Sequence, residues 1–169
     1  KTVRDDTTLI DYLLRNQHTS PFEQVVLTFH CKMPIFIARQ WVRHRTARLN
    51  EISGRYSVME DEFYIPDAQD IARQSTNNKQ GRGEIFPTQE AQQIQDQFVL
   101  EQKNANASYE KLLNMGLARE LARMNLPLSL YTQWYWQMDL NKLFHLLKLR
   151  LHKRAQREIR VYAQVILYI

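Results

Sequence analysis

The segment SLYTQWYWQMDLNKLFHLLKLR, residues 129–150, changes its hydrophobic period at Asp139. Before Asp139 the apolar and polar positions alternate, which predicts a strand with one buried face. The expected inward set is Leu130, Thr132, Trp134, Trp136 and Met138, opposite Tyr131, Gln133, Tyr135 and Gln137. After Asp139, a good N-cap residue, leucines and Phe144 recur at helical spacing. The segment therefore predicts a strand that leads directly into a helix.

A second alternating segment, VVLTFHCKM at residues 25–33, predicts another strand. Leu27, Phe29, Cys31 and Met33 would share its buried face. We interpret Cys31 and His30 as structural, because a metal ion needs more ligands than this pair supplies. No metal site is expected.

Helical spacing recurs in five further segments. We expect helices after Thr7 and Thr8 (residues 9–17), after Pro34 (35–42), from Thr88 to Gly116 as one long helix, over LARELARMN (117–125) and over the final residues 155–169. The polar, glycine-bearing segment Gln74 to Glu84 is expected to be an exposed, mobile loop. The predicted fold class is α+β, a single domain over residues 1–169 with a small, mainly antiparallel sheet and several helices. Because the chain begins at a lysine, we expect its N-terminus to be incomplete.

The composition limits the class of protein. With 169 residues, of which 44% are hydrophobic, the chain can form one domain with a core. It has one cysteine and lacks an apolar run of the roughly 20 residues that a membrane span needs, so we expect a soluble cytoplasmic protein. A net charge of +5 favours anionic partners: nucleic acid, an anionic membrane or phosphorylated small molecules.

Reactive side chains are concentrated in RHRTARLNEISGRYS, residues 43–57. Four arginines, a histidine and a glutamate stand there beside a glycine and three small hydroxyl residues. Charge runs are usually solvated surface, but here Trp41 and Val42 lead into the run and polar residues are interleaved with it. The mixture suits a pocket that binds phosphate through guanidinium groups and a neutral ring through hydrogen bonds. A basic nucleic-acid-binding module is the alternative, although the common nucleic-acid-binding motifs are missing.

The same stretch resembles the signature of the flavin-dependent thymidylate synthases, RHRxxSxNExSxRYS. The matching residues are Arg43, His44, Arg45, Asn50, Glu51, Ser53, Arg55, Tyr56 and Ser57. HTSPFE, PIFIARQW, LARxxLP, the YT strand and DLNKLFHLLKLR also resemble family segments, so the resemblance covers nearly the whole chain. Arg48 departs from the pattern, which has serine there; a native variation, an altered residue or a side chain turned outward would each be consistent with the sequence. The property that this departure concerns is the local affinity for the cofactor.

The resemblance implies reductive methylation of dUMP to dTMP, with methylenetetrahydrofolate as carbon donor and NADPH as reductant through bound FAD. It implies that the cofactor-binding residues are Ser20, Glu23, Arg43, His44, Arg45, Glu51, Asn141 and His145. The implied substrate-binding residues are Gln40, Arg43, Glu51, Ser53, Gly54, Arg55, Arg123 and Arg150. The implied catalytic residues are Arg150, which would favour negative charge on the uracil ring, His18 beside the flavin, and Ser53, which we interpret as a positioning hydroxyl.

The resemblance also implies a homotetramer whose active sites are shared between subunits. The apolar stripes of the long helix and of the C-terminal helix agree with burial against other subunits. Neither nucleic acid nor a membrane is an expected partner.

Overall fold

The computed structural model describes residues 3–169, which form two compact units. Unit 1 contains residues 3–30, 44–50 and 135–169, and unit 2 contains Cys31–Arg43 and Glu51–Trp134. The mixture of helices with two small antiparallel sheets confirms the predicted α+β class. The assignment of residues 1–169 to a single domain stays a prediction.

The main sheet has three strands, β1 (Val26–Pro34), β5 (Tyr131–Asp139) and β2 (Arg48–Glu51), in the order β1-β5-β2. Both strands predicted from alternation are confirmed, and the inward set of β5 is buried: Trp134, Trp136 and Met138 are only 2%, 1% and 3% exposed. In β1, Cys31 and Met33 are buried, while His30 and Lys32 on the alternate positions are exposed.

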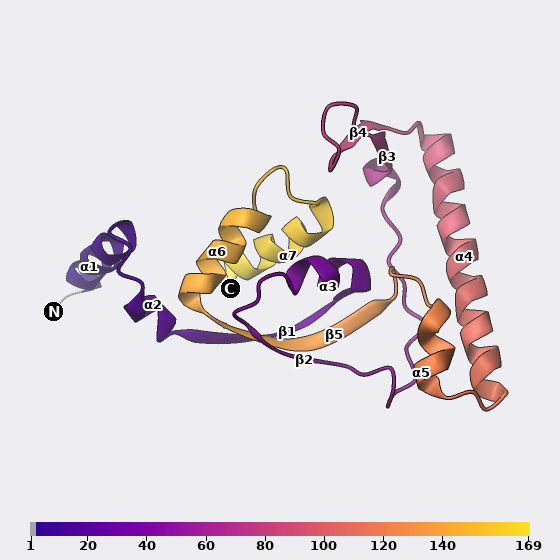
Figure 1. Ribbon diagram of the computed structural model, residues 1–169. Coiled ribbons are helices and arrows are strands. Elements are labelled where there is room, and N and C mark those ends of the chain that lie inside the picture. The colour runs from indigo at the N-terminus through magenta and orange to yellow at the C-terminus, as the bar shows by residue number, and fades with distance from the viewer. Residues whose placement is uncertain (1–2) are drawn as a thin grey trace. The chain divides into compact units, whose positions relative to one another are not determined.

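Unit 1 contains four helices, α1 (Val3–Arg15), α2 (Ser20–Glu23), α6 (Leu140–Arg150) and α7 (Arg157–Tyr168). Asp139 caps α6 as predicted, because its carboxylate accepts from the Lys142 amide at 2.8 Å. Helices α6 and α7 lie side by side (Figure 1), and α2 packs on α6 through the rings of Phe22 and Phe144, 5.9 Å apart. These contacts fix the side chains of α6 relative to α2.

Helix α1 begins earlier than predicted. Thr7 and Thr8 lie inside it, and their hydroxyls donate to the carbonyls of Val3 and Arg4 at 2.9 and 3.0 Å. A threonine can satisfy its hydroxyl on the preceding turn of a helix, so its presence does not by itself mark a helix start.

Unit 2 contains α3 (Ile35–Trp41), α4 (Thr88–Asn114), α5 (Arg119–Ala122) and two short 3-10 helices, η1 (Ala68–Asp70) and η2 (Arg123–Asn125). The long helix α4 is confirmed, and Gly116 follows it with φ +83°, the left-handed conformation that glycine tolerates. The single helix predicted over 117–125 is wrong. The segment divides into α5 and η2, which lie beside α4 (Figure 1).

A loop is confirmed for residues 75–81 of the predicted segment Gln74 to Glu84, whereas the two ends of the segment belong to a hairpin of β3 (Ala72–Gln74) and β4 (Arg82–Ile85). The Gln74 side-chain amide donates to the carbonyls of Asn78, Lys79 and Gly81 at 3.2–3.3 Å. One polar side chain thus organises the connection, which a composition-based prediction of a loop cannot detect.

Candidate functional site

The end of α6 meets His44, the middle residue of the RHR triplet (residues 43–45), within unit 1. Arg150, the last residue of α6, donates from Nε to Nε2 of His44 at 3.1 Å, and the rings of His44 and His145 lie 6.3 Å apart. Residues 106 positions apart in sequence are therefore in direct contact. Two residues that the resemblance assigned to the cofactor, His44 and His145, thus form one cluster with Arg150, which it assigned to the substrate.

The surroundings of His44 favour its neutral form. Burial, and then the positive charges of Arg150 and His145, lower the pKa of His44 to about 4. Because Nε2 accepts from Arg150, the proton of the neutral ring belongs on Nδ1. Burial also lowers the pKa of Arg150 from its ordinary value. At neutral pH the arginine is therefore a cation that donates to an uncharged imidazole.

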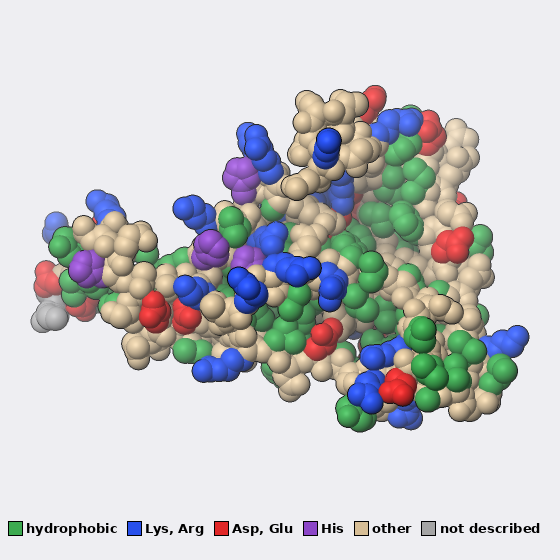
Figure 2. Space-filling view, viewed as in Figure 1, with side chains coloured by type: hydrophobic (Ala, Val, Ile, Leu, Met, Phe, Trp, Pro, Cys, Tyr) green, Lys and Arg blue, Asp and Glu red, His purple; other side chains and the backbone are tan. Residues whose placement is uncertain are grey.

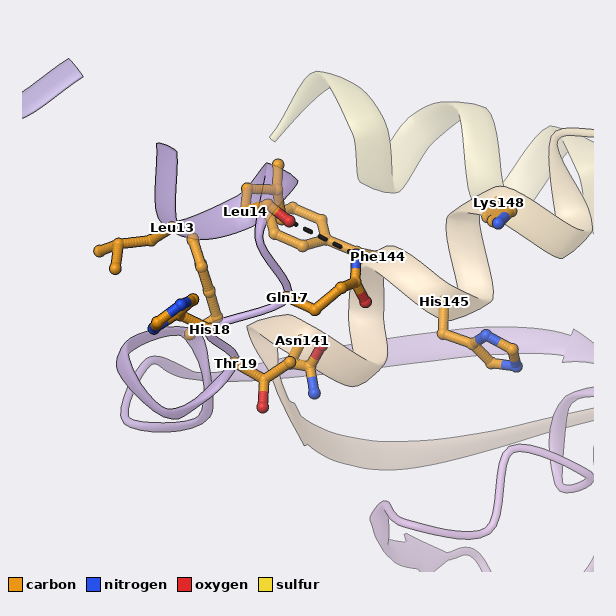
Figure 3. A pocket seen from close by; sticks show the side chains of 10 residues that line it. Leu13, Leu14, Gln17, His18, Thr19, Asn141, Phe144, His145 and Lys148 are labelled. Carbon is orange, nitrogen blue, oxygen red and sulfur yellow. Dashed lines mark hydrogen bonds between the residues drawn. The ribbon is translucent and has the colours of Figure 1, made fainter. Parts of the chain in front are cut away.

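A cavity of about 290 Å³ lies beside this cluster in unit 1. Figure 3 shows Asn141, His145 and Lys148 on α6, with Gln17 and His18 on the segment that follows α1. Leucine and phenylalanine side chains complete the lining: Leu13, Leu14, Phe22 and Phe144, together with Thr19. The cavity therefore offers both apolar surface and several hydrogen-bonding side chains, which a small-molecule site needs.

The structure brings some of the other predicted cofactor residues together. Asn141 donates to the Glu23 carboxylate at 3.3 Å, which joins α6 to α2. Ser20 is exposed at the start of α2, and Arg45 is exposed in the loop before β2. Neither Ser20 nor Arg45 lines the cavity.

In unit 2, the second half of the motif forms a turn around Ser53. Its carbonyl accepts from the amides of Tyr56 and Ser57 at 3.1 and 3.0 Å, and its hydroxyl accepts from the Arg55 amide at 3.3 Å. This arrangement agrees with a positioning hydroxyl. A serine nucleophile would instead donate its proton to a base.

Glu51, at the end of β2, accepts a hydrogen bond from the Thr132 hydroxyl at 2.6 Å. Thr132 is only 4% exposed, so the bond anchors an exposed carboxylate to the buried side of β5. A short bond to an ionised acceptor is among the stronger hydrogen bonds in proteins.

Gly54 is buried against Arg123, which lies on η2. A Cβ added to Gly54 would meet Arg123 Cδ at 3.1 Å and Met59 Sδ at 2.9 Å. The glycine thus allows the motif to approach an arginine that the resemblance assigns to the nucleotide. Gln40 on α3 and Arg43 shortly after it also belong to unit 2.

The discordant residue Arg48 is exposed on β2. Its guanidinium donates to Gln137 Oε1 at 2.7 Å, and Gln137 Nε2 donates to the Thr28 hydroxyl at 2.9 Å. A polar chain thus connects all three strands of the main sheet, which agrees with the outward-turned reading of Arg48.

The only cysteine is not suited to nucleophilic chemistry. Cys31 is buried, and burial raises the pKa of its thiol to about 11. A thiol that stays protonated at neutral pH is a poor nucleophile. The structural interpretation of Cys31 is therefore supported.

Sequence reasoning missed several residues that the structure places at these sites. Lys148 lies one helical turn after His145 on α6, a spacing that could have identified it. Thr132, Arg119 and Glu120 contact the motif from segments more than 60 residues away, and no local pattern indicates such contacts.

The chain thus combines an α+β fold with an arginine-rich motif and a cavity of the size of a small-molecule site, features that suit a protein binding small anionic molecules. All 169 residues match the family model described as thymidylate synthase complementing protein, Thy1, and the chain belongs to this family.

Curated relatives carry the name flavin-dependent thymidylate synthase. The relative from Treponema denticola is 61% identical over 170 residues, covering 100% of this chain and 64% of the relative. The relative from Thermus thermophilus is 55% identical over 166 residues, covering 98% of this chain and 60% of the relative. This chain thus spans about 56–64% of the length of the first relatives it matches.

A solved structure with a similar fold is that of the UMP/dUMP methylase PolB from Streptomyces cacaoi bound with 5-Br UMP. It has a TM-score of 0.89 and 37% sequence identity, and the match covers 94% of this chain and 74% of that one. Among residues 3–169 of the present chain, no helix has the length and apolarity needed to cross a membrane.

Proposed function

We propose that the chain carries the catalytic site of a flavin-dependent thymidylate synthase, which converts dUMP to dTMP by reductive methylation. The main support is that the matched motif is folded into two sets of contacts. In unit 1, His44 joins Arg150. In unit 2, Glu51 and Gly54 contact Thr132 and Arg123, while the turn of the motif itself holds Ser53.

The residues present fit FAD as the cofactor. The cavity beside α6 offers apolar and aromatic side chains for a ring and donors from Asn141 and Lys148. Arg43, His44 and Arg45 supply donors of the kind that a pyrophosphate needs, and Ser20, Glu23 and His145 complete the proposed set. When bound, FAD would supply the reducing equivalents that NADPH provides.

The protein's own contribution is binding and polarisation of the pyrimidine. We assign dUMP to Gln40, Arg43, Glu51, Ser53, Gly54, Arg55, Arg123 and Arg150. The Arg150 guanidinium would favour negative charge on the N3 and O4 side of uracil, which makes the 5,6 double bond more reactive. His18, on the cavity wall, would lie where methylenetetrahydrofolate or nicotinamide approaches. Ser53 orients the ring, and a thiol nucleophile is not required.

A homotetramer in the cytoplasm is part of the proposal. Support comes from exposed apolar residues on α7, where Val161, Val165 and Leu167 are 45%, 56% and 57% exposed. Sedimentation of the FAD-loaded protein tests this assembly. A monomer with full flavin occupancy would contradict it.

The alternative of nucleic-acid binding is favoured only by the net charge of +5 and by exposed basic side chains. Figure 2 shows Lys and Arg side chains interspersed with hydrophobic, acidic and uncharged groups on the viewed face. Assays of FAD binding, dUMP binding and NADPH oxidation decide between the two functions.

The test is the visible absorption spectrum of the purified protein with added FAD, followed by dUMP titration and dUMP-dependent NADPH oxidation. Flavin absorbance that responds to dUMP, together with NADPH oxidation, supports the proposal. A protein that stays colourless, does not oxidise NADPH and binds RNA or DNA would favour the nucleic-acid alternative.

A further inference from the structure

The turn that ends the motif, Gly54–Arg55–Tyr56, is held by the short segment formed by α5 and η2 in unit 2. Arg119 NH1 donates to the Tyr56 carbonyl at 2.7 Å. The next residue, Glu120, accepts from Arg55 Nε at 3.0 Å. Arg123 then approaches Gly54, with NH1 within 3.3 Å of the position of an added Cβ. Three successive motif residues are thus matched, in reverse order, by three residues of one segment.

These contacts act on different parts of the turn. The bond from Arg119 fixes a backbone carbonyl and is independent of the side chain at position 56. The bond to Glu120 uses the Nε group of Arg55. A guanidinium oriented at Nε can still present two parallel donors to an anion.

The Arg55–Glu120 ion pair is too exposed to contribute much to folding stability. The two side chains are 57% and 50% exposed, and such surface pairs contribute little to stability. A neighbouring acid would also weaken anion binding by Arg55 if charge alone mattered. The contact is therefore better explained by orientation of the guanidinium.

We propose that Arg119 and Glu120 are positioning residues that hold the motif turn and direct Arg55 toward the phosphate of the nucleotide substrate. This inference rests on the proposed function and assigns roles to two residues outside the motif. Both would act through Arg55 and Tyr56, without touching the substrate.

The test measures binding of dUMP and of deoxyuridine, which lacks the phosphate, to the FAD-loaded full chain by calorimetry. Arg119→Ala and Glu120→Ala should each weaken dUMP binding about fivefold or more, the equivalent of losing one oriented contact. Deoxyuridine binding should change by less than about twofold. Glu120→Gln keeps an acceptor for Arg55 and should restore dUMP affinity to about the wild-type value or better, because it removes the negative charge.

The matched control is Glu90→Ala, which breaks the pair of Arg73 and Glu90, 3.3 Å apart with side chains 53% and 50% exposed. It should leave dUMP affinity unchanged. Wild-type affinity in both α5 alanine variants would overturn the inference, and so would an equal loss for dUMP and deoxyuridine, which would indicate general loosening of the turn. If the wild-type protein itself binds no dUMP, the proposed function fails instead.

Discussion

Arg150 Nε lies 3.1 Å from His44 Nε2 and donates a hydrogen bond to it, which connects the end of α6 to the RHR triplet. This bond requires an uncharged imidazole, because a protonated histidine has no acceptor atom. The motif histidine is therefore in a position to orient the arginine that we propose to act on the uracil ring. A flavin contact and this orienting role are compatible, because the ring has a second nitrogen.

Acidification should break the contact between His44 and Arg150 only at low pH. With its pKa lowered to about 4, His44 stays neutral when folded, while the unfolded chain takes up the proton near the ordinary value of 6.5. Between these values the unfolded state binds more protons, so stability is complete above pH 6.5 and decreases as the pH falls toward 4.

An NMR titration of the His44 ring tests this expectation directly. Arg150→Ala removes the nearest cation and should raise the pKa of His44. As a second measurement, urea denaturation gives the free energy of unfolding at pH 7 and at pH 5. This free energy should fall less between the two pH values in His44→Gln than in the wild-type protein. An unchanged His44 titration in the arginine variant would contradict the assigned contact.

Thr132→Val should remove the hydrogen bond that anchors Glu51 and leave the packing at position 132 nearly unchanged. Valine fills nearly the same volume but cannot donate to the carboxylate that now lies 2.6 Å from the hydroxyl. We expect a loss of about 1–2 kcal/mol in the free energy of unfolding and weaker dUMP binding. Urea denaturation and dUMP titration measure the two effects. Thr28→Val, at an exposed position of β1, is the control and should retain dUMP affinity.

Gly54→Ala should weaken dUMP binding more than it weakens folding. The added methyl group would lie 3.1 Å from Arg123 Cδ and 2.9 Å from Met59 Sδ, and both are parts of flexible side chains that can move. We expect a loss of dUMP affinity of about tenfold, with a change in unfolding free energy of about 1 kcal/mol or less. A crystal structure of the variant should show a displaced Arg123. Unaltered affinity would mean that Arg123 is not needed beside Gly54.

Arg48→Ser restores the serine of the family pattern and tests whether Arg48 changes the affinity for FAD. The change removes an exposed hydrogen bond to Gln137, so the cost to folding should be within about 0.5–1 kcal/mol. Because the side chain is directed to Gln137, FAD affinity should stay within about twofold of the original. Flavin fluorescence quenching measures that affinity. A large increase on restoring serine would show that Arg48 obstructs the cofactor.

Sequence alone determined the elements with a strong local pattern. The alternation in 129–139 predicted β5, since successive side chains of a strand face opposite sides. Asp139 marked the start of α6, and Gly116 marked the end of α4, because capping depends on neighbouring residues only. The motif likewise indicated the segment to which we assign the proposed site. The start of α1 and the hairpin at residues 72–85 were missed where side chains bond to backbone in ways that several residue types allow.

Only the tertiary structure decided which partners these residues have. Glu51 meets Thr132, Arg55 meets Glu120 and His44 meets Arg150 across 65 to 106 positions of sequence. The lowered pKa of His44 and the raised pKa of Cys31 likewise depend on burial and on charges brought near by folding. Hydrogen-bond distance and desolvation are properties of three-dimensional proximity, and spacing along a single chain does not encode them.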